Sequence, residues 1–162
     1  MVPLLFFISL DLTLFRYVMW IGNFNEMEDK KTFLIIDDDN DDCDFFCEAV
    51  AEIDKTAHCF SAMDGEDGLK KLRDITIQLP DFIFLDLNMP RMDGRQCLVE
   101  LKKDPKLRDI PVIIFTTSSA QKDIDETSKL GATYFLTKPS DFQSLRKKIE
   151  HVMEKIRPAL IL

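Results

Sequence analysis

Residues 82–94 read Phe-Ile-Phe-Leu-Asp-Leu-Asn-Met-Pro-Arg-Met-Asp-Gly, and this stretch decides the fold. Its first four residues are a continuous apolar run, which is typical of a short strand buried on both faces of a sheet. The run ends at Asp86, and a loop rich in turn residues follows from Pro90 to Gly94. The stretch therefore predicts an acidic side chain at the carboxyl end of a buried strand.

Strand-like and helix-like segments alternate on both sides of this run. Further strands are expected at Thr32–Ile36, Thr56–Ser61, Val112–Phe115 and Tyr134–Thr137. Apolar residues recur at helical spacing after each strand, and residues able to cap helices precede three of these segments: Asn40/Asp41, Ser118/Ser119 and Ser140/Asp141. Asp64-Gly65-Glu66 is expected to form a turn before another helix. The alternation predicts an α/β fold, a five-stranded parallel sheet flanked by five helices.

The composition is that of an ordinary globular domain. The 162 residues are 46% hydrophobic and 31% charged, and a chain of this length can bury a core without disulfides. The 29 acidic residues outnumber the 21 basic ones, which gives a net charge of −8. Because a broad nucleic-acid surface needs clustered Lys and Arg, no nucleic-acid partner is expected.

The four cysteines are Cys43, Cys47, Cys59 and Cys97, and they form no CxxC pair. Cys43 and Cys47 share one helix face at i,i+4, so a metal-binding pair is conceivable. We expect instead that all four are small apolar side chains in the reduced core of a cytoplasmic protein.

Residues 1–30 are expected to be an extension outside the folded domain. Residues 1–21 are largely apolar, but Asp11 and Arg16 interrupt a run that would need about 20 apolar residues to cross a membrane. The positive segment and cleavage site of a signal peptide are missing, and a membrane location is not expected.

Two interpretations of this extension remain open. Met27 begins the natural-looking start Met-Glu-Asp-Lys-Lys, so residues 1–26 can be mis-called upstream sequence. Alternatively, they form a short anchor or partner-binding segment. The folded domain is expected over residues 31–157, with 158–162 as a short tail and no output domain after it.

Polar residues follow four of the expected strands. They are, in chain order, Asp37-Asp38-Asp39, Asp86, Thr116 and Lys138. In open α/β sheets, ligands bind outside the carboxyl ends of the strands, so these side chains should lie together. Clustered carboxylates repel each other, and Mg²⁺, which prefers oxygen ligands, resolves that conflict. A carboxylate beside Mg²⁺ and a lysine can accept a phosphoryl group.

Four motifs at these strand ends resemble the receiver domain of bacterial two-component response regulators. They are Phe-Leu-Ile-Ile-Asp37-Asp38-Asp39, Phe-Leu-Asp86-Leu-Asn88-Met-Pro90-Arg-Met-Asp-Gly94, Ile-Ile-Phe-Thr116-Thr117-Ser and Tyr-Phe135-Leu-Thr-Lys138-Pro139. Each is weak alone, but four in the right order are specific. The resemblance runs from about Lys31 to Ile156 and is strongest to the single-domain group. It implies a flavodoxin-like sheet with strand order 2-1-3-4-5.

The resemblance also implies roles for individual residues. Asp86 would be the phosphoacceptor, with Thr116 and Lys138 holding the phosphoryl oxygens. Asp38 and Asp86 would ligate Mg²⁺ directly, Asp37 largely through water, and the backbone carbonyl of Asn88 would complete the protein ligands.

The remaining implied features concern signalling. Phe135 falls at the aromatic switch position and would move when Thr116 is drawn toward the phosphoryl group. Asn88 and Ser118 would tune the lifetime of the aspartyl phosphate, so that the protein dephosphorylates itself without being a turnover enzyme. The bond between Lys138 and Pro139 would be cis.

The resemblance implies a sensor histidine kinase or a histidine phosphotransfer protein as the phosphoryl donor. A downstream protein would dock on the helix after Ser118/Ser119, the strand Tyr134–Thr137 and the last helix. A homodimer is left open, and the sequence names neither the cognate kinase nor the target.

Two other functions are weighed against this one. Asp37-x-Asp39 after an apolar strand resembles the nucleophile motif of haloacid-dehalogenase-type phosphatases, which would make Asp37 the nucleophile. The other is a degenerate receiver that binds a partner without phosphate. Leu-Asn-Met-Pro-x-Met-Asp-Gly disfavours the first, and the presence of all five expected active-site side chains disfavours the second.

Overall fold

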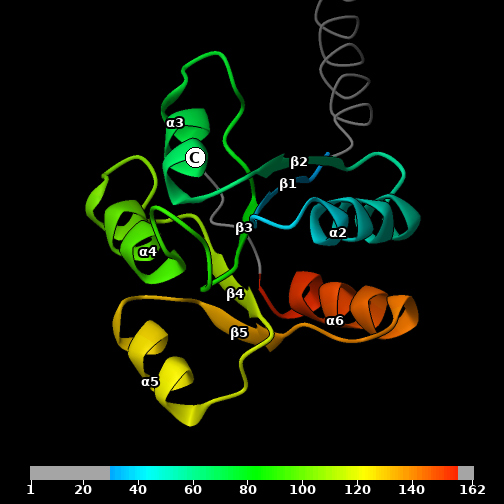
Figure 1. The fold of residues 1–162 in the computed structure, drawn as a ribbon. Coiled ribbons are helices and arrows are strands. Elements are labelled where there is room, and N and C mark those ends of the chain that lie inside the picture. The colour runs from blue at the N-terminus through cyan, green and yellow to red at the C-terminus, as the bar shows by residue number, and fades with distance from the viewer. Residues whose placement is uncertain (1–29, 157–162) are drawn as a thin grey trace, which may run out of the picture. The chain divides into compact units, whose positions relative to one another are not determined.

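The computed structural model describes residues 30–156 (Figure 1). The interpretations of residues 1–29, including a start at Met27, lie outside the described residues, as does the tail 158–162. The expected domain boundaries therefore stay predictions. Within the described part of the chain, no helix is long and apolar enough to cross a membrane.

Five parallel strands form one sheet in the order β2-β1-β3-β4-β5, so the expected fold class and strand order are confirmed. They are β1 (Thr32–Ile36), β2 (His58–Ala62), β3 (Phe82–Leu85), β4 (Val112–Thr116) and β5 (Tyr134–Thr137). The second strand begins two residues later than expected. The Asp54 side chain accepts hydrogen bonds from the backbone and hydroxyl of Thr56, at 2.9 and 2.7 Å, and this local turn keeps Thr56 out of the strand.

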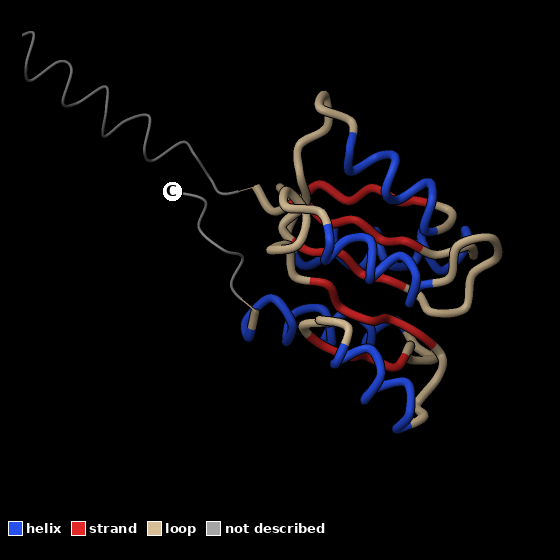
Figure 2. The backbone as a smooth tube through the Cα atoms, turned by 90° about the vertical axis from the view of Figure 1, so that its left-hand side faces the viewer, coloured by secondary structure: helices blue, strands red, loops and turns tan. Residues whose placement is uncertain are grey.

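Helices cover both faces of the sheet (Figures 1 and 2). On one side lie α2 (Asn40–Ile53) and α6 (Phe142–Lys155), and on the other α3 (Gly65–Arg73), α4 (Gly94–Lys103) and α5 (Gln121–Lys129). Alternate residues of β1 enter the two halves of the core, with Phe33 in one and Leu34 in the other. Continuous apolar strands are therefore what this architecture requires.

The core beneath α2 and α6 is aromatic. Phe33 stacks on Phe82 with ring centroids 5.2 Å apart, and the Phe46 ring lies 4.5 Å from that of Phe84. All four side chains are fully buried. Because burying one such side chain contributes about 1.5–3 kcal/mol, this cluster fixes α2 firmly on the sheet.

Aspartates cap four of the five described helices, at Asp39, Asp64, Asp93 and Asp141. Caps of this kind contribute about 1 kcal/mol each. The residue that caps α2 is Asp39, one position before the expected Asn40/Asp41. The expected cap at Asp141 is confirmed. The expected cap at Ser118/Ser119 is wrong, because α5 begins after Ala120 without a side-chain cap and Ser118 bonds Asp123 instead.

The expectation of four free cysteines in a reduced core is also wrong. Cys47 of α2 and Cys59 of β2 form a disulfide, with Cα atoms 5.5 Å apart, while Cys43 and Cys97 are free and buried. Sequence spacing misses this pair because the two residues meet only when α2 folds back along β2. The i,i+4 pair Cys43 and Cys47 consequently forms no metal site.

The bond between Lys138 and Pro139 is trans, since no peptide bond in residues 30–156 is cis. The cis form implied by the resemblance is thus not present. The trans form is the intrinsically favoured one for an X-Pro bond, by about 0.5–1 kcal/mol.

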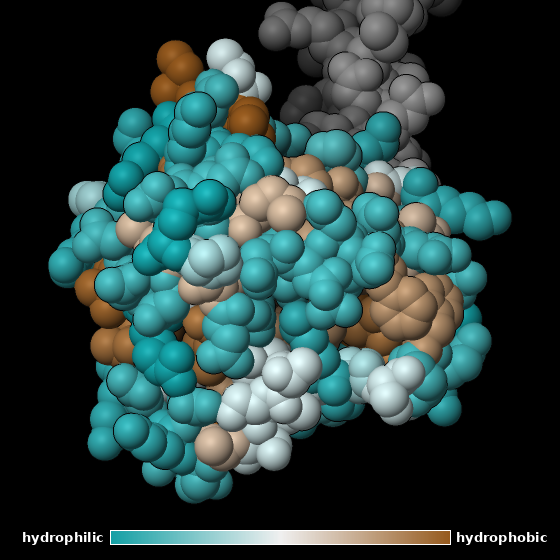
Figure 3. Space-filling model, viewed as in Figure 1, coloured by the Kyte–Doolittle hydropathy of each residue, from teal (hydrophilic) through white to brown (hydrophobic). Residues whose placement is uncertain are grey.

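The face of the molecule in Figure 3 is mostly hydrophilic. This agrees with the charged composition of the chain. Apolar atoms appear in this view in groups at the top, at the left edge and on the right. In the loop after α3, Ile75 is 92% exposed.

Candidate functional site

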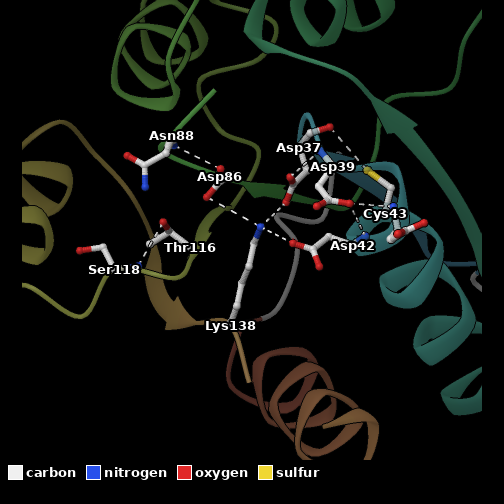
Figure 4. Close-up of polar contacts among 10 residues, drawn as sticks. Asp37, Asp39, Asp42, Cys43, Asp86, Asn88, Thr116, Ser118 and Lys138 are labelled. Atoms are coloured by element: carbon white, nitrogen blue, oxygen red, sulfur yellow. Dashed lines mark hydrogen bonds and ion pairs between the residues drawn. The ribbon is translucent and has the colours of Figure 1, made fainter. Parts of the chain in front are cut away.

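The carboxyl ends of four strands meet at one edge of the sheet, and the predicted site residues converge there (Figure 4). Asp37 directly follows β1, Asp86 follows β3 and Lys138 follows β5, while Thr116 is the last residue of β4. Carboxylate oxygens of Asp37, Asp38 and Asp86 lie within 4.8 Å of one another. The structure thus brings together all the acidic residues predicted for the metal site.

Burial differs sharply among the three carboxylates. Asp37 and Asp86 are 1% and 6% exposed, whereas Asp38 is open to solvent. Burial raises the pKa of Asp37, against the hydrogen bonding of Lys138, which lowers it. Because a hard divalent cation with oxygen ligands relieves both the desolvation and the mutual repulsion, this donor set fits Mg²⁺.

The ammonium group of Lys138 lies among the carboxylates. Its Nζ is 2.6 Å from Asp37 Oδ2 and 2.7 Å from Asp42 Oδ2, but 4.0 Å from Asp86 Oδ1. Burial alone would lower the pKa of Lys138, but its hydrogen bonds to Asp37 and Asp42 outweigh this and raise the pKa. Lys138 is therefore fully charged near neutral pH, and its amine is held on the side of Asp37.

Asp42 is a site residue that the sequence reasoning did not single out, since it was interpreted only as part of an acidic helix cap. It lies in the first turn of α2, where Asp39 caps the helix and accepts the Asp42 backbone N–H at 3.3 Å. One signal could have found it. A residue four positions after Asp38, on a helix that starts at the strand end, must lie close to that end.

Thr116 is fully buried and is tied to both neighbours of the site. The Lys138 backbone N–H donates to the Thr116 carbonyl oxygen at 2.7 Å, which fixes Lys138 beside β4. The Thr116 hydroxyl oxygen accepts the backbone N–H of Ser118 at 3.4 Å. The position of the β4–α5 loop is thus coupled to the Thr116 side chain.

A polar network continues from this loop to α4. Ser118 Oγ donates to Asp123 Oδ2 at 2.5 Å, and Arg95 donates to Asp123 Oδ1 at 2.5 Å and to Glu126 at 3.0 Å. The hydrogen bond from Ser118, together with Arg95, lowers the pKa of Asp123. Arg95 lies 28 residues before Asp123 and 31 before Glu126, so no local pattern in the sequence predicts these two contacts.

The loop after Asp86 is held by its backbone. The Asn88 N–H donates to Asp86 Oδ2 at 3.2 Å, and Arg91 adopts the left-handed conformation, with φ of 65°. The Arg91 guanidinium pairs with Asp64, the buried cap of α3. This pairing anchors the loop that carries Asn88, whose backbone carbonyl as a metal ligand stays a prediction.

Gly94 begins α4 directly behind Asp86. A Cβ atom at this position would collide with the backbone oxygen of Asp86 and would lie 2.8 Å from the Cα of Leu87. Only glycine permits this approach, so the last residue of the deciding stretch sets how closely α4 packs behind the candidate acceptor.

Phe135 lies in β5, paired with Ile114 of β4. Its side chain is half-buried and packs against the half of the core that α3 and α4 cover. An intermediate burial suits a residue that changes position, but the switch role stays a prediction.

Comparisons with known proteins agree with this geometry. The family model described as the response regulator receiver domain matches residues 33–150. The chain is 29% identical to the probable methanogenesis regulatory protein FilR2 of Methanothrix harundinacea over 136 residues, 82% of this chain and 88% of that protein. It is 38% identical to the response regulator Rcp1 of Synechocystis over 73 residues, 45% of this chain but only half of Rcp1.

Two solved structures are similar to the whole sheet and its helices. The phosphorylated cyanobacterial phytochrome response regulator RcpA superposes with a TM-score of 0.72 at 30% identity, over 77% of this chain and 92% of that one. The Mn²⁺-bound form of Rcp1 gives a TM-score of 0.70 at 27% identity, over 82% of this chain and 98% of that one. Rcp1 thus binds a divalent cation, and the acidic cluster found in the present chain is consistent with divalent metal binding.

Proposed function

Because the chain belongs to the family of response regulator receiver domains, we propose that it takes a phosphoryl group from a phosphohistidine onto Asp86. The observation that carries this assignment is the convergence of Asp86, the acidic pair Asp37 and Asp38, and the ammonium of Lys138 at one sheet edge. Receiver domains are in general signalling proteins that act with histidine kinases or phosphotransfer proteins and with downstream targets. The phosphorelay role expected from the sequence follows from membership of this family.

Neighbouring groups orient the Asp86 carboxylate and place a positive charge near it. Asp86 is held by the N–H of Asn88, so one carboxylate oxygen is oriented while the other can attack phosphorus. The new P–O bond forms as the P–N bond of the phosphohistidine breaks, and the imidazole nitrogen leaves with the bonding electrons. Lysine has three N–H donors, and Lys138 donates a hydrogen bond to Asp42 and forms an ion pair with Asp37, so donor capacity remains for a phosphoryl oxygen.

Asp37, Asp38, Asp86 and the backbone carbonyl of Asn88 are the residues that would hold Mg²⁺. When bound, Mg²⁺ would supply positive charge against the phosphoryl oxygens. Asp37 also holds Lys138 in place, which gives this carboxylate a role even without direct contact to the metal.

The signal would leave the site through Thr116. Its hydroxyl releases the Ser118 N–H when it turns toward a phosphoryl oxygen, and the Ser118–Asp123 bond then transmits the loop movement to α5. Phe135 follows, and the face formed by α5, β5 and α6 docks a downstream protein. Asn88 and Ser118 set the lifetime of the acyl phosphate through water access. The cytoplasmic location and a homodimer also stay predictions.

The two alternatives are not favoured. A phosphatase of the haloacid-dehalogenase type would need Asp37 as a free nucleophile, but its side chain is buried and paired with Lys138. A degenerate receiver would lack part of the site. This chain has all five expected side chains at the strand ends: Asp37, Asp38, Asp86, Thr116 and Lys138.

Direct localisation of the phosphoryl group tests the proposal. The purified chain is incubated with acetyl phosphate and Mg²⁺, the acyl phosphate is reduced with borohydride, and peptides are mapped by mass spectrometry. We expect modification at Asp86 alone, and none when a chelator replaces Mg²⁺. Modification at Asp37, or labelling that does not need a divalent cation, would contradict the assignment.

Replacing Phe135 with alanine tests whether phosphoryl transfer to Asp86 can occur without the conformational change that follows it. We expect unchanged labelling of Asp86, because Phe135 does not contact the acceptor, but loss of the conformational response. Heteronuclear NMR with beryllofluoride and Mg²⁺ measures that response as shifts in the amides of α5 and β5. Normal shifts in the variant would argue against a switch at Phe135.

A further inference from the structure

The disulfide between Cys47 and Cys59 ties a helix to the edge of the sheet. Cys47 lies in the middle of α2, and Cys59 lies in β2. β2 is an edge strand, which pairs only with β1 in the described part of the chain. Figure 1 shows α2 running beside β2. The Cα atoms are 5.5 Å apart, a separation at which two cysteines can bond without backbone movement.

The four cysteines fall into two chemical classes. Cys43 and Cys97 are free and buried, at 3% and 0% exposure, so a disulfide reagent in solution cannot reach either thiol. Cys47 and Cys59 are half-buried and reach solvent from the rim of the α2–α6 half of the core. Redox chemistry is thereby confined to one pair.

We expect the fold to persist without the bond between this pair. Phe46 and Val50, on either side of Cys47 in α2, are buried in the aromatic half of the core and also hold the helix on the sheet. Disulfides that a well-packed domain does not need, in compartments that keep thiols reduced, are usually transient and redox-sensing. The same pair can therefore exist as a dithiol in an intact domain.

We propose that Cys47 and Cys59 form a reversible thiol–disulfide site whose oxidant is a low-molecular-weight disulfide such as oxidised glutathione. One cysteine thiolate attacks the small disulfide, forms a mixed disulfide and releases one thiol. The other cysteine attacks the protein sulfur of that bond and releases the second thiol. The protein dithiol loses two electrons and two protons, and one small disulfide becomes two thiols.

The disulfide restricts the motion of β2, the edge strand, relative to α2. A strand paired on one side opens more readily than a central strand, and the disulfide holds it to α2, the helix that carries Asp42. Oxidation should therefore stabilise the α2–β2 unit without occupying the phosphoryl site.

Redox titration of the full chain tests the site. The protein is equilibrated in reduced and oxidised glutathione, quenched by alkylation, and mapped by non-reducing peptide mass spectrometry. We expect one intramolecular Cys47–Cys59 bond in oxidised buffer, full alkylation of both in reduced buffer, and a melting temperature lower by roughly 10 °C in the reduced state.

Single variants distinguish the mechanism from unspecific oxidation. Cys47→Ala should trap the half-reaction as a glutathione adduct on Cys59, and its melting temperature should no longer rise on oxidation. Cys97→Ala removes a buried thiol that forms no disulfide, so this variant should keep the full redox response. Far-ultraviolet circular dichroism verifies that each variant is folded. Bonds between two chains, adducts that persist on the wild-type pair, or a bond that excess reduced glutathione cannot open would each overturn the proposal.

Discussion

Replacing Asp86 with asparagine should lower phosphoryl incorporation by more than about 1,000-fold, since removing a nucleophile costs far more than disturbing its neighbours. Asparagine keeps the size of the side chain and can still accept the N–H of Asn88 through its amide oxygen. The loss would therefore report missing nucleophilicity and not a rearranged loop. Incorporation from radiolabelled acetyl phosphate with Mg²⁺ measures it.

The same variant should also change divalent cation binding. Without one of three converging carboxylates, the apo site has less repulsion, so the metal-free melting temperature should rise while the gain on adding Mg²⁺ shrinks. Asp109→Asn, a change of the same charge at an exposed residue, is the matched control and should behave like the wild type. Labelling that survives in Asp86→Asn but vanishes in Asp37→Asn would instead support the phosphatase alternative.

Replacing Gly94 with alanine should reduce the free energy of unfolding by about 3 kcal/mol or more. The added methyl group would meet the backbone oxygen of Asp86 and the Cα of Leu87, and neither can move aside as a flexible side chain could. Relief of the clash requires α4 to move away from β3, which also displaces the acceptor loop. Urea denaturation gives the loss of stability, and phosphoryl incorporation should fall with it.

Gly68→Ala is the control for this effect. Its methyl group meets mainly the Cδ1 of Ile36, the far end of a side chain that can rotate, and alanine favours the helix interior over glycine. The loss of stability should therefore be clearly smaller than for Gly94→Ala. Equal losses in the two variants would mean that the approach to the Asp86 backbone is not the controlling contact.

The fold was predictable where apolar runs end at charged residues. β1 ends just before Asp37 and β3 just before Asp86, and the expected bounds of both strands match the structure because hydrophobicity changes abruptly there. β2 was misplaced because its start depends on a side-chain turn at Asp54, which hydrophobicity does not register. The start of α5 was misplaced for a similar reason, since the Ser118 hydroxyl is taken up by Asp123.

The candidate site was predictable in its strand-end residues and not in their partners. Topology fixes the position of a residue that follows a parallel strand, so the sequence predicts Asp86 and Lys138 at one edge of the sheet. The contacts of Arg95 with Asp123, and of Cys47 with Cys59, depend on how helices pack side by side. No periodicity in the sequence carries that information.

The bond between Lys138 and Asp42 joins residues 96 positions apart, and it has a consequence for biosynthesis. A chain synthesised as far as β4 already carries the acidic pair and the acceptor, but its carboxylates lack their ammonium counter-charge. That charge arrives only when β5, the last strand in sequence, pairs with β4. From the role proposed for Lys138, we expect nascent and truncated chains that lack β5 to accept phosphoryl groups more slowly than the finished protein.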